Sequence, residues 1–316
     1  MRISPKMLAE ALKLTRVNSC PGEDSLSITV PEIFRPGLQF AGYFSIFPNE
    51  RVQLIGKTEL AYLESLEPVV AESRLARYFS EPLPCIIIGR GMECPPILLR
   101  HAERTSVPIY TLNVPTSVIA ARAMLYLSEV FAPRQTLHGV LMEVFGQGVL
   151  ITGDSGVGKS ECALELLNHG HLLVADDVVD VFRVGDNLYG ESPEMIRDFM
   201  ELRGVGIIDV KKIYGIGAVL KRKTLNLIIH IEFWDASKTY DRLGNTENTR
   251  EILGVRVPLL EVPVRPGRSL ATIVEIAARN YSLRAEGYRA AEELDRRLRT
   301  RYSVPQDKPE TERRQG

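Results

Sequence analysis

The chain reads Gly153-Asp154-Ser155-Gly156-Val157-Gly158-Lys159-Ser160 near its middle, which fits the pattern G-x-x-x-x-G-K-[ST]. This pattern is typical of the loop that wraps nucleotide phosphates. Its glycines let the backbone turn tightly and point successive N–H groups at an anion. Lys159 can reach the β- and γ-phosphates, and the hydroxyl of Ser160 can ligate Mg²⁺. The stretch therefore predicts a nucleotide-binding loop.

The residues on either side of the loop support this prediction. Residues 148–152 are expected to form a short buried strand, and residues 160–167 a helix. The N-terminus of that helix would face the phosphates, where its dipole attracts negative charge. An ordinary glycine-rich turn would not explain why Lys159 and Ser160 follow the third glycine. Strand, loop and helix in this order indicate an α/β domain.

The composition is that of a globular protein in solution, with 45% hydrophobic and 25% charged residues. Its 316 residues suit two domains of ordinary size. The net charge of −1 gives no general attraction to nucleic acid, and no apolar run is long enough to span a membrane. Because the amino terminus also lacks a signal-peptide core, we expect a cytoplasmic protein. The cysteines form no C-x-x-C pair and are expected to be free thiols: Cys20, Cys85, Cys94 and Cys162.

Residues 1–132 are predicted to form an amino-terminal α/β domain with a largely parallel sheet, because strand-like runs alternate with helical ones. Strands are expected at residues 38–47, 51–55, 85–89 and 108–112, and helices at residues 58–66 and 116–131. The turn Gly56-Lys57-Thr58 resembles the end of a second phosphate loop. The position of its first glycine is occupied by Arg51, so no phosphate site is expected there. The predicted domain boundary lies at Ala132-Pro133, where proline discourages a helix from continuing.

Two adjacent acids, Asp176 and Asp177, follow an apolar run at residues 171–175 that is expected to be a strand. A carboxylate at a strand end behind a phosphate loop suits a group that acts on the metal ion or its water. Adjacent strand residues point to opposite sides, so the two acids need not share a role. The residues alone leave open which of the two is a base.

Other segments of the second domain, residues 133–298, also carry candidate groups. A strand is expected at residues 138–145, and helices at residues 270–281 and 285–298. The run Glu201-Leu202-Arg203-Gly204-Val205-Gly206-Ile207-Ile208-Asp209 favours a loop close to a ligand. Arg242 is a candidate phosphate-directed cation. The turn Pro263-Val264-Arg265-Pro266-Gly267-Arg268 precedes Ser269, a good N-cap, and can present two guanidinium groups to an anion. Residues 299–316 are polar and predicted to be a disordered tail.

Six motifs, taken in order, resemble those of the bacterial HPr kinase/phosphorylase family. They lie at residues 138–144, 153–161, 174–177, 201–210, 240–244 and 263–268. The resemblance covers the whole second domain and is weaker over residues 1–130. It implies an α/β fold in which a smaller amino-terminal domain precedes a P-loop catalytic domain like that of phosphoenolpyruvate carboxykinase.

The resemblance also implies roles for particular residues. The family binds ATP through residues that match Gly153 to Ser160, and holds Mg²⁺ with residues that match Ser160 and Glu201. His138, Lys159, Asp177 and Arg242 match catalytic positions, and Asp177 matches the carboxylate that takes the proton from the acceptor serine. The run from Glu201 to Asp209 matches a segment needed in both directions of the reaction. The run from Pro263 to Arg268 matches one needed mainly for dephosphorylation.

The family phosphorylates a serine of the phosphocarrier protein HPr and thereby regulates carbon metabolism and the phosphotransferase system. In the reverse reaction, orthophosphate attacks the phosphoserine and pyrophosphate leaves. Family members are hexamers. The resemblance therefore implies a cytoplasmic homohexamer that uses ATP, Mg²⁺ and orthophosphate, with HPr as its partner and with neither nucleic acid nor membrane.

Two other functions are compatible with a phosphate loop and paired acids. One is a kinase for a small metabolite, whose ATP turnover would depend on that metabolite and not on HPr. The other is a nucleotide-sensing regulator without transfer activity, whose output would persist after loss of the catalytic carboxylate. Residues outside the loop that resemble the HPr kinase family argue against the metabolite kinase. The substitution Asp177→Asn would separate the regulator from the enzymes, because it should abolish transfer and leave ATP binding largely intact.

Overall fold

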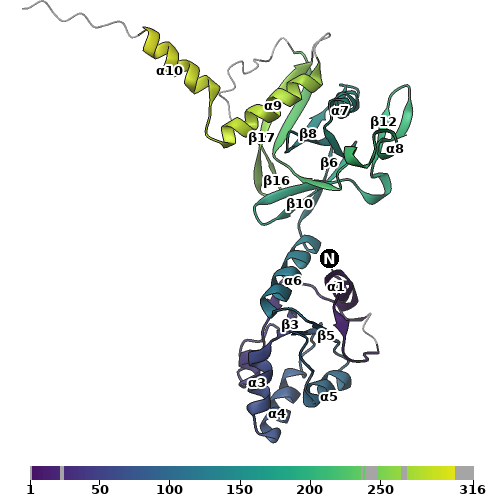
Figure 1. Cartoon of the computed structure of the whole chain (residues 1–316), viewed down its shortest axis with the longest axis vertical. Coiled ribbons are helices and arrows are strands. Elements are labelled where there is room, and N and C mark those ends of the chain that lie inside the picture. The colour runs from purple at the N-terminus through teal and green to yellow at the C-terminus, as the bar shows by residue number, and fades with distance from the viewer. Residues whose placement is uncertain (1, 22–24, 236–237, 239–247, 265–268, 303–316) are drawn as a thin grey trace, which may run out of the picture. The chain divides into compact units, whose positions relative to one another are not determined.

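The computed structural model describes residues 2–21, 25–235, 238, 248–264 and 269–302, with side chains up to residue 299 (Figure 1). The chain divides into two compact units, Met1–Ala132 and Pro133–Gly316. Each unit contains its own sheet covered by helices, so each can bury a core of its own.

The amino-terminal unit is built on a five-stranded sheet in the order β1-β5-β4-β3-β2. Its strands are β1 (Thr15–Arg16), β2 (Ile33–Phe34), β3 (Val52–Ile55), β4 (Ile86–Gly89) and β5 (Ile109–Leu112). Strands β2 to β5 are parallel, and only β1 pairs antiparallel, on β5. The predicted largely parallel sheet is therefore confirmed.

Helices cover both faces of this sheet, because its central strands are apolar on both sides. Leu54 and Ile87 pack into the cluster formed with α1 (Pro5–Leu12) and α6 (Thr116–Val130). Ile86 and Ile88 pack into the opposite cluster. That cluster is completed by α2 (Gly37–Phe40), α3 (Lys57–Ser65), α4 (Pro68–Tyr78) and α5 (Pro96–Arg104). A strand buried on both faces reads as a continuous apolar run, as residues 85–89 do.

The strand predicted at residues 38–47 is wrong. The short helix α2 begins this segment, and turns follow it. The amide of buried Gln39 donates to the carbonyl oxygens of Tyr43 at 3.2 Å and Ile46 at 3.1 Å. The side-chain amide therefore uses backbone carbonyls that, in a strand, would accept hydrogen bonds from a neighbouring strand.

The carboxyl-terminal unit contains a six-stranded mixed sheet in the order β16-β17-β15-β8-β7-β9. Its strands are β7 (Val140–Val144), β8 (Gln147–Gly153), β9 (Leu172–Ala175), β15 (Leu227–Phe233), β16 (Thr249–Ile252) and β17 (Val255–Val264). Strands β8, β15 and β17 are parallel, whereas β7 is antiparallel to both β8 and β9. The predicted strand and helix on either side of the glycine-rich loop are confirmed as β8 and α7 (Lys159–Asn168).

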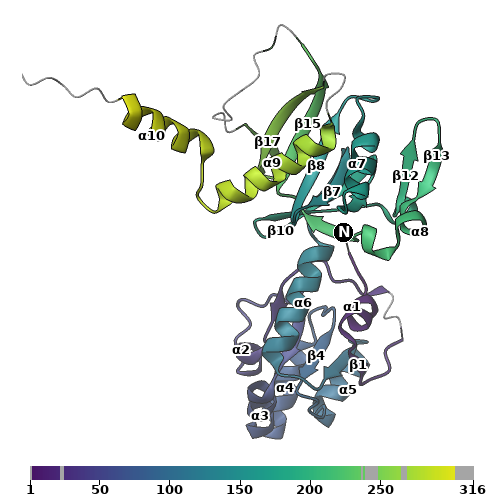
Figure 2. The same cartoon turned by 45° about the horizontal axis from the view of Figure 1, so that its top comes forward.

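This sheet is enclosed by helices on one face and by a second sheet on the other. Val149 and Ile151 of β8 pack with α7 and α9 (Leu270–Ala285), which Figure 2 shows beside the sheet. Leu150 points to the other face. There lies a four-stranded sheet of β6 (Arg134–His138), β10 (Val178–Val184), β11 (Asn187–Glu191) and β14 (Arg222–Thr224). Alternation along β8 thus supplies both halves of the core.

A two-stranded ribbon of β12 (Phe199–Leu202) and β13 (Gly206–Asp209) packs beside α7. The 3₁₀ turn η2 (Glu194–Ile196) precedes it, and α8 (Val210–Tyr214) and η3 (Ile216–Ala218) follow it. The last helix, α10, spans Ala290–Tyr302. The helices predicted at 270–281 and 285–298 therefore have different bounds, and α10 runs past residue 298, where the tail was expected to begin. Residues 303–316 lie outside the described residues.

The strand predicted at residues 138–145 is divided at Gly139. His138 ends β6 in the four-stranded sheet, whereas Val140 begins β7 in the six-stranded sheet. A side chain at position 139 would put its Cβ 2.6 Å from the carbonyl oxygen of Ile151, so the close crossing requires glycine.

None of the described helices is both long and apolar enough to cross a membrane. The predicted free cysteines are confirmed.

Candidate active site

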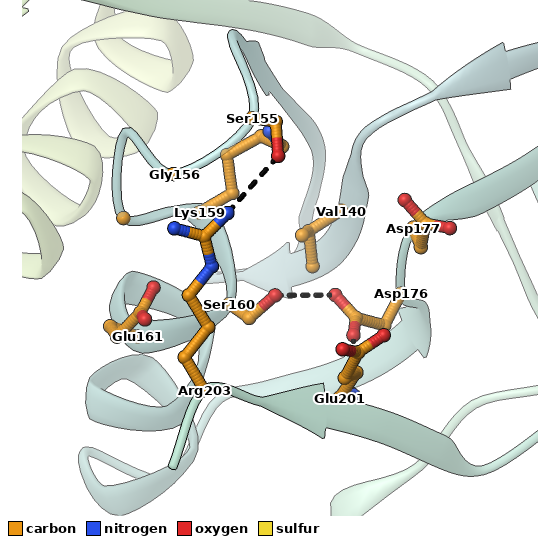
Figure 3. Close-up of a pocket in the computed structure, with 11 residues that line it drawn as sticks. Val140, Ser155, Gly156, Lys159, Ser160, Glu161, Asp176, Asp177, Glu201 and Arg203 are labelled. Atoms are coloured by element: carbon orange, nitrogen blue, oxygen red, sulfur yellow. Dashed lines mark hydrogen bonds between the residues drawn. The ribbon is translucent and has the colours of Figure 1, made fainter. Parts of the chain in front are cut away.

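A cavity opens where the glycine-rich loop meets the N-terminus of α7 (Figure 3). Side chains from four segments line it: the loop and first turn of α7, the end of β9, the start of β7, and the β12–β13 ribbon. The lining residues are Val140, Ser155, Gly156, Gly158, Lys159, Ser160, Glu161, Asp176, Asp177, Glu201 and Arg203. Folding therefore brings the predicted phosphate loop, the paired acids and the 201–209 segment to one place.

The shape of the loop depends on glycine at both of its ends. A Cβ on Gly153 would collide with the carbonyl oxygen of Ile231 on the neighbouring strand, and Gly158 has a φ of +101°. That φ lies in the left-handed region, which glycine enters without steric penalty. The ammonium of Lys159 donates to the carbonyl oxygens of Gly153 and Asp154, both at 2.9 Å. An ammonium has three N–H donors, so one is left to point into the cavity that Lys159 lines.

Asp176 is the buried member of the acid pair, with 6% of its surface exposed. Its carboxylate accepts a hydrogen bond from the Ser160 hydroxyl at 3.2 Å and another from the backbone N–H of Glu201 at 3.1 Å. Burial raises the pKa of Asp176, and these two bonds partly oppose the rise. One carboxylate therefore joins the α7 N-terminus to strand β12.

Asp177 is the exposed member of the pair and faces the cavity. Its φ of +62° lies in the left-handed region, which aspartate enters more readily than most residues. Its carbonyl oxygen accepts from the backbone N–H of Gly139 at 3.0 Å, which holds this turn in place. The two acids thus have different environments, and which of them acts as a base stays a prediction.

The β12–β13 ribbon supplies Glu201 and Arg203. Met200 and Leu202 flank Glu201 along β12 and pack into the core, so Glu201 points to the opposite face. Arg203 follows β12, in the turn that leads to β13. The Arg203 guanidinium donates to the Ser155 hydroxyl at 3.2 Å and lies across the tip of the loop (Figure 3). The ribbon thus brings a carboxylate from its strand β12 and a cation from its turn to the cavity.

Two family models match the chain. The model described as "HPr Serine kinase C-terminal domain" matches residues 129–298, and the one described as "HPr Serine kinase N terminus" matches residues 3–127. The chain belongs to the HPr serine kinase family. The resemblance found in the sequence is therefore confirmed, and the cavity lies inside the range matched by the first model.

Named relatives of the HPr serine kinase family are similar over nearly the whole chain. The HPr kinase/phosphorylase of Alkaliphilus metalliredigens (strain QYMF) is 45% identical over 297 residues, which cover 94% of this chain and 96% of the relative. That of Geobacillus thermodenitrificans (strain NG80-2) is 45% identical over 298 residues, with the same two coverages. A solved structure, the Hpr(Ser) kinase/phosphatase from Coxiella burnetii, is 36% identical, covers 51% of this chain and 98% of its own, and has a TM-score of 0.47.

The oxygen donors of the cavity suit Mg²⁺, the metal ion implied by the resemblance to HPr kinases. One oxygen of the Asp176 carboxylate accepts from the Ser160 hydroxyl and the other from the backbone N–H of Glu201, so both segments are held at the same carboxylate. Within the described part of the chain, no group of three or more His, Cys, Asp or Glu side chains is placed to hold a metal. Mg²⁺ does not need such a cage, because it commonly takes one or two protein ligands and completes its shell with phosphates and water.

Some of the residues predicted for an HPr kinase site are not brought into this cavity. His138 is exposed and pairs with Val178 in the β6–β10 ladder. Val178 directly follows Asp177 along the chain, but His138 itself is not among the residues that line the cavity. Pro263 and Val264 end β17, where they pair with Glu232 and Phe233 of β15. Arg242, Arg265, Pro266, Gly267 and Arg268 lie outside the described residues. Val157 of the loop is buried in the core.

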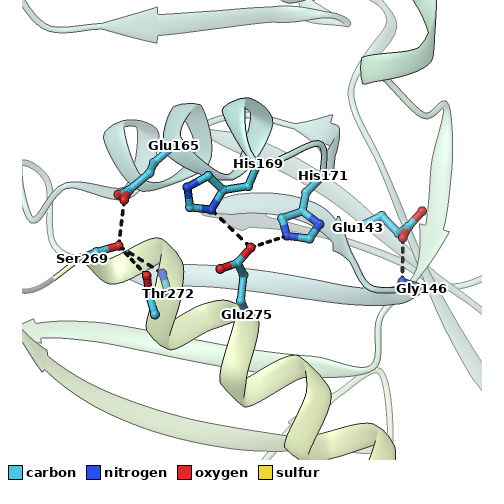
Figure 4. A network of polar contacts seen from close by, with 8 residues as sticks. All are labelled: Glu143, Gly146, Glu165, His169, His171, Ser269, Thr272 and Glu275. Carbon is cyan, nitrogen blue, oxygen red and sulfur yellow. Dashed lines mark hydrogen bonds and ion pairs between the residues drawn. The ribbon is translucent and has the colours of Figure 1, made fainter.

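The helix that carries the loop is also fixed at its far end, which no sequence pattern indicated (Figure 4). Glu275 of α9 bonds to His171 at 2.9 Å and to His169, the C-cap of α7, at 3.2 Å. The hydrogen bond from His171, assisted by His169, holds the pKa of Glu275 below its ordinary value. Ser269, the N-cap of α9, donates to Glu165 of α7 at 2.8 Å. Polar contacts thus tie α7 to α9 at two points.

Proposed function

We propose that this protein transfers a phosphoryl group from ATP to a serine of HPr and, in reverse, transfers the phosphoryl group of phosphoseryl-HPr to orthophosphate. The catalytic unit would be a P-loop domain of the phosphoenolpyruvate carboxykinase type. The observation that carries the proposal is the meeting of Lys159, Ser160, Asp177 and Glu201 around one cavity. The relatives named HPr kinase/phosphorylase support the choice of HPr as substrate.

The nucleotide would lie along residues 153–160, with its phosphates over the N-terminus of α7. Backbone N–H groups there and the remaining donor of Lys159 would bind phosphate oxygens. Ser160 and Glu201 would hold Mg²⁺. When bound, this ion neutralises negative charge on the phosphates. Asp176, through its bonds to both segments, would keep these two ligands in register.

Asp177 would act as the base. A seryl hydroxyl is a weak nucleophile, and a carboxylate within hydrogen-bond reach accepts its proton as the oxygen bonds to phosphorus. Exposure leaves Asp177 accessible to a hydroxyl that arrives from another protein, whereas buried Asp176 is already occupied by Ser160 and Glu201. Lys159 and Arg203 would stabilise the charge that spreads over the transferring group.

In the reverse direction, an orthophosphate oxygen would attack the phosphoserine phosphorus, and the bond from phosphorus to the serine oxygen would break. Asp177 would return its proton to that serine oxygen, and pyrophosphate would leave. The sequence-based roles of His138, Arg242, Arg265 and Arg268 in these steps remain predictions.

A direct assay tests both directions. The purified protein with ATP, Mg²⁺ and HPr should yield phosphoserine on HPr, detected by mass spectrometry, and an HPr variant with alanine at the acceptor serine should yield none. Phosphoseryl-HPr with orthophosphate should yield pyrophosphate. Absence of product in both directions would reject the proposal. ATP turnover that depends on a small metabolite, or ATP binding without transfer, would favour the two alternative functions.

We also propose that the protein acts in the cytoplasm as a homohexamer, as the family resemblance implies. Sedimentation equilibrium of the full chain would give a mass about six times the 35.3 kDa of one chain. A monomeric mass at the concentrations of the transfer assay would contradict the hexamer without affecting the assignment of the reaction.

A further inference from the structure

The two faces of the β12–β13 ribbon differ in their surroundings. On the inner face, Met200 and Leu202 are 1% and 7% exposed and pack into the core of the unit. Residues at alternate positions point outward, so Phe199 and Glu201 share the outer face. In the antiparallel register, Ile207 is the direct partner of Glu201, and partners across a ladder project from the same face.

The outer face therefore places an apolar side chain beside a cavity residue. Ile207, across the ladder from Glu201, is 74% exposed, and Phe199, two residues before Glu201 on β12, is 44% exposed. At the turn of the ribbon, Val205 is 73% exposed. An aliphatic or aromatic side chain binds neither phosphate nor Mg²⁺, and these side chains contribute little to the core. Their exposure next to a reaction cavity is therefore suited to a partner that covers them.

We infer that Phe199 and Ile207 form the docking surface for HPr, an inference that rests on the proposed function. A serine of a folded protein can reach Asp177 only if the protein surface around that serine covers the rim of the cavity. The ribbon forms part of this rim, because Glu201 of the same face and Arg203 of its turn line the cavity. Protein interfaces have an apolar centre surrounded by polar groups. If HPr docks on this face, its own surface must carry an apolar patch beside the acceptor serine.

Kinetics with HPr as the varied substrate test this docking surface. Ile207→Thr and Phe199→Thr keep strand-forming residues and remove apolar contact area. Truncation of a central apolar contact weakens binding by about tenfold or more, so the KM for HPr should rise about tenfold in each variant, with a much smaller change in kcat. Ile207→Val, which keeps most of the apolar surface, should stay close to the wild type. Ile46→Thr is the matched control, because Ile46 is 71% exposed in the amino-terminal unit.

Three outcomes would overturn the inference. An unchanged KM for HPr in both threonine variants would show that the ribbon face does not contact HPr. A parallel loss of affinity for a fluorescent ATP analogue would show that these residues act on the cavity itself. A changed sedimentation mass would show that this face joins copies of the chain. Failure of the proposed function is a different result, because the wild type itself would then leave HPr unphosphorylated.

Discussion

The chain contains Gly-Lys-[ST] twice, each time between a parallel strand and a helix. Gly56-Lys57-Thr58 begins α3, and Gly158-Lys159-Ser160 begins α7. At α3, the Glu59 carboxylate accepts from the backbone N–H of Gly56 at 3.0 Å and pairs with Arg35 at 2.8 Å. At α7, no side chain of the described residues caps Gly158. The N-terminus of α3 thus binds the protein's own carboxylate, whereas that of α7 has no such partner among the described residues, as the proposed phosphate site requires.

The two helices are also stabilised at different ends. Glu59 fixes the first turn of α3, whereas Glu275 fixes the end of α7 through His169 and His171. A helix whose first turn must bind and release a ligand gains from being held elsewhere, because its position then does not depend on the ligand. The comparison teaches that three matching residues do not make a phosphate site. Two further features decide whether such a turn can bind phosphate. The loop before it must be long enough to wrap the anion, and no carboxylate of the protein may already occupy the position of the anion.

The largest expected effect is on phosphoryl transfer, when the lysine of each Gly-Lys-[ST] turn is replaced by alanine in a separate variant. Lys159→Ala should lower kcat/KM for phosphoryl transfer to HPr by about 10³-fold, because a cation aimed at the phosphates is lost. Lys57→Ala should leave it within about twofold, since α3 has no anion site. Steady-state kinetics on both purified variants measure this difference. If both variants lost kcat/KM to the same extent, the proposal that only the turn before α7 binds phosphate would be wrong.

The next effect separates the two acids. Asp177→Asn should lower kcat by about 10²-fold or more and leave the affinity for an ATP analogue intact, because only a proton acceptor is lost. Asp176→Asn should instead raise the Mg²⁺ concentration needed for half-maximal activity by about 10-fold, because Ser160 and Glu201 lose a shared anionic acceptor. Mg²⁺ titrations of both variants check this. If Asp176→Asn lowered kcat without changing the Mg²⁺ requirement, Asp176 and not Asp177 would be the base.

A smaller effect concerns the carboxylate that closes the α3 turn. Glu59→Gln should destabilise the protein by about 0.5–1 kcal/mol at pH 7, because a charge at the helix N-terminus is removed. Burial alone would raise the pKa of Glu59, but the hydrogen bonds from Arg35 and from the Gly56 N–H more than offset it, so the pKa lies below its ordinary value. The stabilisation is therefore complete above the ordinary glutamate pKa of about 4.3 and is lost as the pH falls through the lower folded value.

Thermal unfolding of the wild type and Glu59→Gln across this pH range measures that contribution. The difference in Tm should be present at pH 7 and should shrink in acid. A difference that is independent of pH would mean that the side-chain shape and not the charge of Glu59 supports the turn. Transfer activity at pH 7 should be unchanged in this variant, which separates it from the lysine and aspartate variants of the α7 site.

The smallest effect is expected at the other end of α7. Glu275→Gln should lower the free energy of unfolding by about 0.2–0.5 kcal/mol, because a partly exposed contact between a carboxylate and histidine side chains is weak. Since its histidine neighbours hold the pKa of Glu275 low, this stabilisation is present above the ordinary glutamate pKa and is lost below it. Amide hydrogen exchange should become faster in the last turn of α7, with less change at its N-terminus. Unchanged exchange would show that the Ser269–Glu165 contact suffices.

The sequence predicted the local parts of this protein well. Glycine and proline punctuation and apolar runs identified β8, α7 and most strands of the amino-terminal unit, because these signals act between near neighbours. Strand alternation allowed different roles for Asp176 and Asp177, but both acids follow the end of β9, and the left-handed turn at Asp177 separates them. The strand predicted at residues 38–47 was wrong because backbone carbonyls of this segment accept hydrogen bonds from the Gln39 amide. A propensity pattern does not reveal that a side chain will compete with strand pairing in this way.

Contacts between distant residues were decided only by the tertiary structure. Nothing local indicates that Asp176 bonds to Ser160 and Glu201, that Arg203 lies over Ser155, or that Glu275 holds the end of α7. The sequence alone determined which segment is chemically able to wrap a phosphate, because tight turns and N–H donors depend on residues next to one another. Folding decided which carboxylate is buried and which faces the cavity. That choice depends on burial and on hydrogen-bond partners 16 to 25 residues away along the chain.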